Sequence, residues 1–264
     1  MPVVFACIAP HAGHLLAAPP SITPVPESRA AMKRMRSALR NSRADTLAIL
    51  TPHGVYAEEY VTVGVAETAR GELDDRTINA RTDVDLVAAW AYHGSSLGIP
   101  IAPAAPAEDV PFPLDWGVTI PLALLDPAGE LPVAIACPGR AVPRKHLVAW
   151  GEALAHAAND LGRRVAVIIS ADQGHGHAKD GPYGFSPISA EYDRAMVKAV
   201  QADDLASLLD WKDDWIDAAL PDSYWQTLAL LGIRKHVSLS PCFLSYEVDH
   251  YFGLLCAMYE SAIV

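Results

Sequence analysis

The 264-residue sequence lacks the features that mark secreted, membrane or nucleic-acid-binding proteins. No uncharged apolar run reaches the roughly 18 residues that a membrane helix needs, and no basic segment precedes the apolar N-terminal run. We therefore expect neither a membrane span nor a signal peptide. The net charge is -11 without any stripe of Lys and Arg, which argues against a nucleic-acid partner. The 4 cysteines form no CxxC pair, which predicts buried, reduced thiols in a cytoplasmic protein.

Two common catalytic signatures are also absent. The chain has no GxGxxG or Walker sequence, so its glycine-rich stretches do not predict a phosphate-binding loop. It has no GxSxG sequence either, which disfavours a serine hydrolase with a nucleophile elbow.

Short β-rich runs alternate with helical stretches, which predicts an α/β fold. We expect a single domain, residues 1–264, with a central, mainly parallel sheet flanked by helices. The expected strands are residues 3–9, 46–51, 60–66, 131–137, 164–170 and 240–246. The expected helices are residues 27–41, 83–97, 119–125, 144–161, 189–200 and 223–231. The Pro- and Ala-rich residues 99–113 predict an ordered loop, and the tail YFGLLCAMYESAIV fits either a strand or a buried helix.

Two of the predicted strands end in the same pattern, Pro-His followed within two residues by Gly. His11 lies in APHAG and His53 lies in TPHG. A third strand leads into the segment that carries Asp172, His175 and His177, and the strand at 240–246 leads into Glu247. Ligands of open α/β sheets bind beyond the carboxyl ends of the strands, so parallel strands would bring these side chains to one edge. The alternative is that the two Pro-His histidines lie in unrelated surface turns.

His11, His53 and Glu247 would supply two imidazoles and one carboxylate. Such a set suits Fe(II) in oxygenases because it leaves coordination positions open for substrate and O2. Zinc hydrolases also use two His and one Glu, so these residue types do not decide the metal. The pattern therefore predicts a metal site at the carboxyl ends of the strands.

Two further stretches have both a functional and a structural interpretation. The segment SADQGHGHAKDGPYGF fits a general acid or base, because imidazole titrates near working pH, but also fits a solvated turn. Asp115 directly precedes a predicted helix, so it is either a site residue or a helix N-cap.

The motifs in their order resemble a known family. APHAG, LTPHG, LDWGVTIPL, SADQGHGHAKDGPYGF with EYDR after it, and YEVDHYFGLLCAMYE extend from His11 to Glu260. This order resembles the class III extradiol ring-cleavage dioxygenases of the catalytic-subunit-B superfamily. That superfamily includes protocatechuate 4,5-dioxygenase beta chains, 2-aminophenol 1,6-dioxygenases, DOPA 4,5-dioxygenases and Memo-like proteins.

The resemblance implies His11, His53 and Glu247 as metal ligands and His175 as the acid/base, with His177 as the second choice. The further residues that we expect near the substrate or around the ligands are His14, Asp115, Trp116, Asp172, His177 and Tyr183. Many members have Asp-His-Gly where this chain has Asp115-Trp116-Gly117. Trp116 cannot transfer a proton, although it can stack on an aromatic ring, so this departure affects the substrate rather than the metal.

The activity implied is the insertion of O2 into the ring of a catechol-type diol or a 2-aminophenol, which gives a ring-opened semialdehyde acid. The implied metal is Fe(II), with Mn(II) and Zn(II) as alternatives. The expected partners are a small aromatic substrate and O2, in a homo-oligomer or together with a second subunit. Three alternatives stay open: a divalent-metal hydrolase on the same residues, a Memo-like non-catalytic or redox-metal protein, and a metal-free partner subunit.

Overall fold

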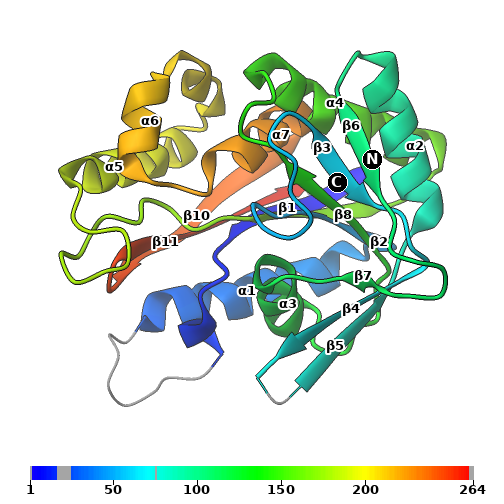
Figure 1. The fold of residues 1–264 in the computed structure, drawn as a ribbon, viewed down its shortest axis with the longest axis horizontal. Coiled ribbons are helices and arrows are strands. Elements are labelled where there is room, and N and C mark those ends of the chain that lie inside the picture. The colour runs from blue at the N-terminus through cyan, green and yellow to red at the C-terminus, as the bar shows by residue number, and fades with distance from the viewer. Residues whose placement is uncertain (1, 17–24, 75, 262–264) are drawn as a thin grey trace.

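The computed structural model describes residues 2–16, 25–74 and 76–261 (Figure 1). Its main sheet has eight strands in the order β10-β11-β1-β9-β2-β8-β3-β6, and a separate sheet has three in the order β5-β4-β7. In chain order the strands are β1 (Val3–Ala9), β2 (Thr46–Leu50), β3 (Val61–Gly64), β4 (Thr68–Leu73), β5 (Arg76–Arg81), β6 (Ile101–Ala104), β7 (Phe112–Pro113), β8 (Val133–Pro138), β9 (Val165–Ser170), β10 (Leu239–Asp249) and β11 (Phe252–Ser261).

The centre of the main sheet is parallel. Strands β1, β9, β2 and β8 are neighbours and run in the same direction. Strand β11 is antiparallel to β1 on one side, and β3 is antiparallel to β8 on the other. Beyond them β10 pairs antiparallel with β11, and β6 pairs parallel with β3. The expected single-domain α/β fold with a mainly parallel sheet is confirmed, and the carboxyl ends of β1, β9, β2 and β8 lie at one edge.

Helices cover both faces of this sheet. They are α1 (Pro26–Ser42), α2 (Val84–Ser96), α3 (Trp116–Leu125), α4 (Arg144–Asp160), α5 (Pro187–Gln201), α6 (Asp213–Ala219) and α7 (Tyr224–Arg234). Helices α2, α4, α5 and α7 pack into the core on one face, whereas α1 and α3 pack into the core on the other (Figure 1). The three-stranded sheet lies on the same side as α1 and α3.

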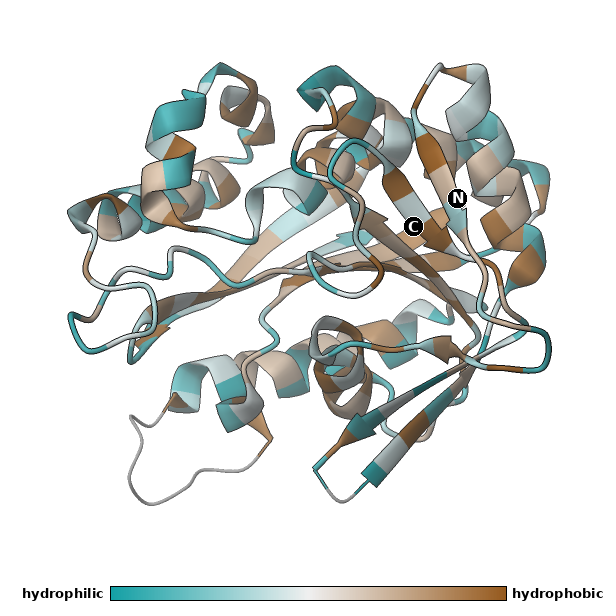
Figure 2. Ribbon diagram, in the orientation of Figure 1, coloured by the Kyte–Doolittle hydropathy of each residue, from teal (hydrophilic) through white to brown (hydrophobic). Residues whose placement is uncertain are grey.

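The two covered faces explain why the central strands are apolar throughout. Ala6 and Ile8 of β1 face the core below α4 and α7, while Phe5 and Cys7 face α1. A strand that is buried on both faces has no solvated side, so the usual alternation of polar and apolar residues is absent. Figure 2 shows the apolar colouring concentrated in these strands and polar colouring on the outer helix surfaces.

Three expectations are decided here. The C-terminal segment forms strand β11, so the helical alternative was wrong. Residues 99–113, expected as a loop, contain β6 and β7, because an edge strand tolerates a proline such as Pro103 that a central strand does not. The four cysteines are free; three of them are buried as expected, whereas Cys242 is only partly buried. No helix within the described ranges is both long and apolar enough to span a membrane.

Helices α4 and α7 approach closely through two glycines. A Cβ atom on Gly151 would lie 1.8 Å from the carbonyl oxygen of Ala229, and one on Gly232 would lie 1.8 Å from the carbonyl oxygen of Val148. Both obstacles are backbone atoms, so no side chain can turn away to make room. Helix α7 also begins beside the functional site described below, and its position depends on this contact.

We predict that Gly151→Ala lowers the free energy of unfolding by about 3 kcal/mol, because the added methyl group forces the two helices apart. Equilibrium unfolding in urea with a metal chelator present measures the change. Gly13→Ala is the matched control, because no atom lies within 4 Å of the position of its Cβ. It should change stability by less than about 0.5 kcal/mol. Equal losses for the two variants would contradict this account of the packing.

Candidate metal centre at the sheet edge

A cavity of about 540 Å³ lies at the carboxyl ends of the parallel strands. Its walls come from segments that follow β1, β2, β8 and β9, from the residues before α7, and from the turn between β10 and β11. The lining residues include His11, His53, Trp116, Arg140, Asp172, His175, Tyr183, Asp222, Tyr251 and Phe252. Many of the chemically active side chains predicted from the strand ends therefore share one space.

His11 follows β1 and is almost fully buried, with 3% of its surface exposed. Its Nδ1 lies 2.9 Å from the hydroxyl of Ser170, the last residue of β9. That hydroxyl donates its own hydrogen to the carbonyl of Gly117, so it accepts from His11 Nδ1–H. The contact fixes the ring with Nε2 turned into the cavity, as neighbouring groups commonly do for metal-binding imidazoles.

His53 follows β2 and is oriented by a short chain of hydrogen bonds. The Thr51 hydroxyl accepts from the backbone N–H of His53 and donates to Asp115 Oδ1 at 3.0 Å. Gly54 has φ +89°, and a Cβ there would lie 2.7 Å from Asp115 Oδ2. A Cβ on Gly117 would lie 2.5 Å from Thr51 Oγ1. The glycines of PHG and DWG are therefore needed for close packing, whereas Gly13 of APHAG meets no such obstacle.

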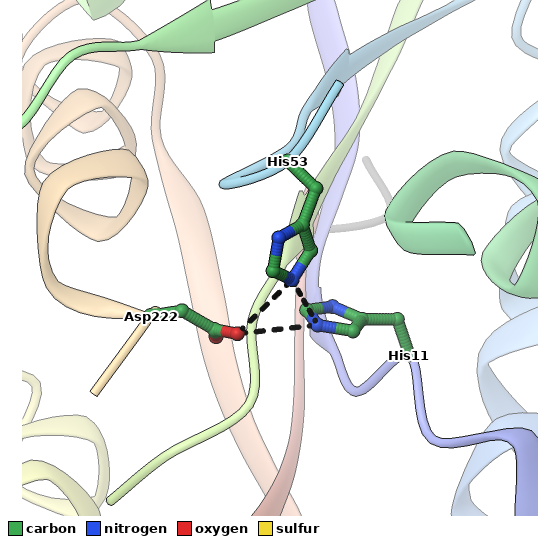
Figure 3. Close-up of side chains that lie close together, drawn as sticks. All are labelled: His11, His53 and Asp222. Carbon is green, nitrogen blue, oxygen red and sulfur yellow. Dashed lines mark hydrogen bonds and ion pairs between the residues drawn. The ribbon is translucent and has the colours of Figure 1, made fainter. Parts of the chain in front are cut away.

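The third donor is Asp222, which lies just before α7 (Figure 3). Its Oδ2 is 3.3 Å from His11 Nε2 and 3.3 Å from His53 Nε2, and the two nitrogens are 3.2 Å apart. Its Oδ1 accepts a hydrogen bond of 2.8 Å from the backbone N–H of Asp172. One carboxylate oxygen is therefore used to hold the side chain in place, and the other faces the two imidazoles.

Sequence reasoning missed Asp222 because the residue does not follow a strand. It comes after α6 and Pro221, and a residue of this type before an apolar helix is ordinarily interpreted as an N-cap. Its place depends on Gln226, a fully buried side chain whose amide donates to the carbonyl of Ser170 at 2.7 Å and also to the carbonyl of Asp222. Gln226 is a polar residue in the first turn of a mostly apolar helix. A polar residue at such a position is the sequence signal that could have indicated how the segment before α7 is held.

Glu247, expected as the carboxylate of the set, is not in this cluster. Its Oε2 accepts a hydrogen bond of 2.7 Å from the backbone N–H of Ser28, in the first turn of α1. Asp249, two residues along β10 and hence on the same face, contacts His14 Nδ1 at 2.5 Å. This face of β10 is turned toward α1 and the segment around His14, so the geometry supports Asp222 in place of Glu247.

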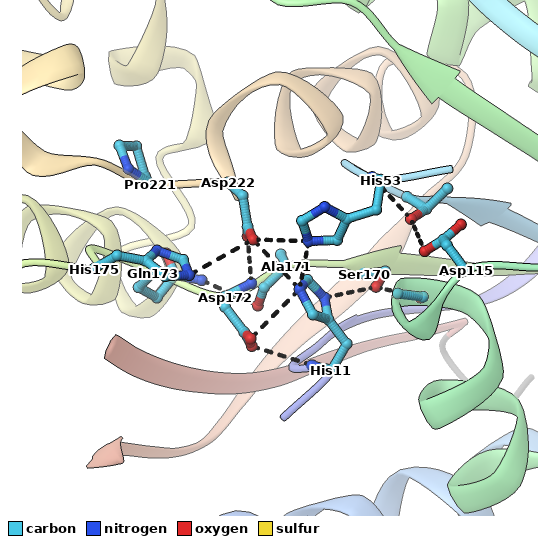
Figure 4. Close-up of polar contacts among 12 residues, drawn as sticks. His11, His53, Asp115, Ser170, Ala171, Asp172, Gln173, His175, Pro221 and Asp222 are labelled. Atoms are coloured by element: carbon cyan, nitrogen blue, oxygen red, sulfur yellow. Dashed lines mark hydrogen bonds and ion pairs between the residues drawn. The ribbon is translucent and has the colours of Figure 1, made fainter. Parts of the chain in front are cut away.

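The two histidines of the GHGH segment have different surroundings. His175 Nδ1 donates to the carbonyl of Leu220 at 2.9 Å, which leaves Nε2 free, 3.8 Å from Asp222 Oδ2 (Figure 4). His177 Nε2 lies 2.8 Å from the fully buried Asp193 and does not line the cavity. Only His175 of the pair is placed to exchange a proton with a molecule in the cavity.

Aromatic rings form the rim. The Trp116 ring lies 4.3 Å from the His53 ring and is 56% exposed, so it presents a free face beside the metal-binding residues. The Tyr183 ring meets the His175 ring edge-on at 5.7 Å, and the Phe252 ring stacks on the same imidazole at 5.5 Å. Aromatic side chains in the lining of the cavity suit an aromatic molecule.

The remaining predicted residues support the site from outside or from its wall. Asp115 stands at the N-cap position of α3 but makes no side-chain capping bond, so its carboxylate serves the Thr51 contact instead. His14 is held by Asp249 and is not among the residues that line the cavity. Asp172 is 3% exposed, and its carboxylate accepts from the backbone N–H of His11 and approaches His11 Nε2 at 3.4 Å.

The buried charges change one another's ionisation. Burial lowers the pKa of His11, but Asp172 and Asp222 outweigh it and raise the value to about 9. Burial works against ionisation of Asp222, yet the imidazoles of His11, His53 and His175 hold its pKa well below the usual range. The pKa of Asp172 is raised, first by burial and then by the charge of Asp222. Asp222 is therefore the carboxylate that is held ionised where a cation would bind.

These donors fit a transition-metal ion. Bonds of ~2.0–2.2 Å from one ion to imidazole nitrogens and a carboxylate oxygen keep adjacent donors roughly 3 Å apart. The three distances of 3.2 to 3.3 Å match that spacing. Two His and one carboxylate also form the set that leaves open positions for other ligands. His11, His53 and Asp222 are therefore the residues that would hold the metal.

The fold and the donors together define an α/β protein with a candidate metal centre at its sheet edge. A family model described as the catalytic LigB subunit of aromatic ring-opening dioxygenase matches residues 9–248. The chain belongs to this family, and the resemblance noted from its motifs is confirmed. Membership supports an aromatic ring-opening dioxygenase function in broad terms, and the family's dioxygenases are metal dependent.

Two individual proteins are more distantly similar. Protein CA_C1420 of Clostridium acetobutylicum is 20% identical over 212 residues, which are 77% of this chain but 45% of that protein. The chain thus spans less than half the length of that relative. The crystal structure of the uncharacterized protein JW3007 from Escherichia coli K12 matches with a TM-score of 0.60 at 15% identity. It covers 97% of this chain and 99% of its own, and at this identity it shows the fold alone.

We predict that His53→Ala and Asp222→Asn each lose most of the bound metal, because each removes one of the three clustered donors. The measurement is metal content by mass spectrometry after loading with Fe(II) under anaerobic conditions and removal of excess ion. Glu247→Gln is the control, and it should keep the metal. Loss of metal in Glu247→Gln with retention in Asp222→Asn would restore Glu247 as the ligand.

We predict that metal binding releases about one proton at neutral pH, because the His11 pKa of about 9 keeps that imidazole protonated before metal binds. Affinity should therefore rise up to about tenfold per pH unit and level off above this pKa. Calorimetric titration of Mn(II) in two buffers with different ionisation enthalpies measures the proton count. A count near zero at neutral pH would show that His11 is already neutral.

Proposed function

We propose that the protein is a non-haem Fe(II)-dependent extradiol dioxygenase. In this proposal it inserts both atoms of O2 into the ring of a catechol-type diol or a 2-aminophenol and yields a ring-opened semialdehyde acid. The observation that carries the proposal is one cavity that holds His11, His53 and Asp222 as a metal-binding set, with the free Nε2 of His175 beside them. The family match supports the same class of reaction.

The proposal replaces Glu247 with Asp222 as the carboxylate ligand, while His11 and His53 keep the roles predicted from the sequence. When bound, Fe(II) would supply the one-electron chemistry that allows O2 to react with a singlet aromatic ring. The protein supplies orientation, proton transfer and exclusion of water.

His175 is the proposed acid/base. Its Nδ1–H is engaged by the Leu220 carbonyl, so Nε2 carries the lone pair and can take a proton from a substrate hydroxyl. The imidazole stacks on Phe252 and meets the edge of Tyr183. The nearby Asp222 carboxylate, 3.8 Å away, stabilises the imidazolium that forms.

Trp116 takes a different role from the histidine that many relatives have at this place. The indole cannot exchange a proton, but its exposed face lies along the cavity and beside the ring of His53. It is therefore proposed to orient the substrate ring by stacking, and proton transfer is left to His175. The expectations of a cytoplasmic protein, and of a homo-oligomer or a second subunit, stay predictions.

The test is anaerobic loading with Fe(II), followed by catechol, gallate, protocatechuate and 2-aminophenol with O2 uptake as the readout. We expect O2 consumption with at least one of them and a coloured semialdehyde product. His175→Gln should keep its iron and lower kcat by roughly 10²- to 10⁴-fold, because it removes the general base.

The matched control is His177→Gln, in which the amide can still donate to Asp193. It should keep iron and most of the activity. A larger loss in His177→Gln than in His175→Gln would move the acid/base role to His177. An iron-loaded protein that consumes no O2 with any of the four compounds would overturn the dioxygenase proposal, and ester hydrolysis without O2 uptake would favour the metal-hydrolase alternative.

A further inference from the structure

Among the described residues that line the cavity, Arg140 is the one lysine or arginine. It lies two residues beyond β8, the fourth parallel strand whose carboxyl end meets this edge of the sheet. The other charged side chains of the lining are Asp172 and Asp222, besides the histidines. Arg140 therefore lines the same cavity as the metal-binding residues.

The Arg140 side chain is positioned by contacts that leave its charge unpaired. Its guanidinium lies over the Trp225 indole at 4.5 Å, and the indole Nε1 donates to the Arg140 carbonyl at 3.0 Å. Its Nη2 donates to the carbonyl of Pro221 at 3.4 Å, directly before the metal-binding Asp222. Across the described part of the chain, the ion pairs include no carboxylate partner for Arg140.

Arg144, four residues further along the chain, differs from Arg140 because it has a carboxylate partner. Its guanidinium also approaches an aromatic ring, that of Tyr224 at 5.3 Å, but it forms an ion pair with Asp213 and donates to the carbonyl of Leu209. It faces a neighbouring groove and does not line the cavity with the metal-binding residues. Arg140 borders that groove too, but the groove already carries the carboxylates of Glu58, Asp213 and Asp217.

The charges of the cavity favour an anionic ligand. Arg140 is exposed and has no carboxylate partner among the described residues, so its guanidinium is available to pair with an anionic ligand. A planar guanidinium binds a carboxylate through two parallel hydrogen bonds, a geometry that a neutral substituent cannot offer. The Pro221 contact keeps this group next to the ligand-bearing segment, within the same cavity as a ring bound at the metal.

We propose that Arg140 forms an anion-binding subsite which selects aromatic substrates with a carboxylate group on or next to the ring. The proposal rests on the proposed ring-opening function for its substrates, whereas the subsite itself depends only on Arg140 and the cavity. It narrows the substrate class from diols and aminophenols in general to their carboxylated forms.

The test compares pairs of diols that differ in charge, with the protein loaded with Fe(II). Protocatechuate and 3,4-dihydroxyphenylacetate carry a carboxylate, and catechol and 4-methylcatechol do not. We expect that kcat/KM, measured by O2 uptake, is at least about tenfold higher for one of the two carboxylated diols than for either neutral diol. A factor of this size corresponds to the free energy that one charge-assisted hydrogen bond usually contributes. Arg140→Gln should abolish this preference, mainly through KM, and Arg140→Lys should restore part of it.

Arg144→Gln is the matched control, because it removes an arginine of the same loop and helix region that does not line the cavity. It should leave the preference for the carboxylated diols unchanged. An unchanged preference in Arg140→Gln, or an equal loss in Arg144→Gln, would overturn the subsite.

A binding measurement separates failure of the subsite from failure of the dioxygenase proposal. Calorimetry under anaerobic conditions should show that the Fe(II)-loaded protein binds 4-hydroxybenzoate more tightly than phenol, and that Arg140→Gln loses the difference. If this holds without O2 uptake on any diol, the subsite stands and the dioxygenase proposal fails. If diols are cleaved but neither measurement distinguishes the carboxylated from the neutral compounds, the subsite fails and the dioxygenase proposal stands.

Discussion

The carboxylate of Asp222 is withdrawn from water and lies between the imidazole nitrogens of three histidines. A buried carboxylate is costly unless every oxygen has a partner, so the surrounding chain has to supply partners at fixed places. The backbone N–H of Asp172 binds one oxygen, and Gln226 joins the segment before α7 to the end of β9. The close contact of α7 with α4 at Gly151 and Gly232 then holds that segment against the sheet. Contacts well outside the cavity thus help to hold the buried carboxylate in place.

The sheet contributes the complementary constraint. Because β1, β9, β2 and β8 are parallel and adjacent, the residues that follow them lie at one edge of the sheet, although long segments of chain separate them in the sequence. The Ser170 hydroxyl then accepts a hydrogen bond from the His11 ring and the Thr51 hydroxyl accepts one from the His53 backbone, and the glycines at 54 and 117 allow the backbone to come close enough. The polar side chains of the cavity thus follow the parallel strands or precede α7, whereas Trp116, at the start of α3, and Tyr183 add exposed aromatic side chains to its lining.

Much of the fold could be predicted from local pattern, because a strand covered on both faces has a continuous apolar run and a helix has a repeating apolar stripe. The same reasoning brought His11, His53 and His175 together, since all three follow parallel strands. It failed for the edge strands β6 and β7, where prolines suggested a loop, and for the carboxylate near the two imidazoles. Glu247 lies near the carboxyl end of β10, and Asp222 lies just before the first residue of α7. The Glu247 side chain is on the face of β10 that is turned toward α1, and the sequence does not show which face of this strand is turned toward the cavity.

The sequence alone determined the fold class, the pair of Pro-His strand ends, the glycine-rich histidine segment and the absence of a proton-transferring residue at Trp116. These are properties of residue type and spacing, and they hold wherever the segments come to lie. The tertiary structure decided that Asp222 faces the two imidazoles, that His175 rather than His177 enters the cavity, and that the unpaired Arg140 shares it. Each of these depends on contacts between residues dozens of positions apart, and such contacts are set by the packing of whole helices against the sheet.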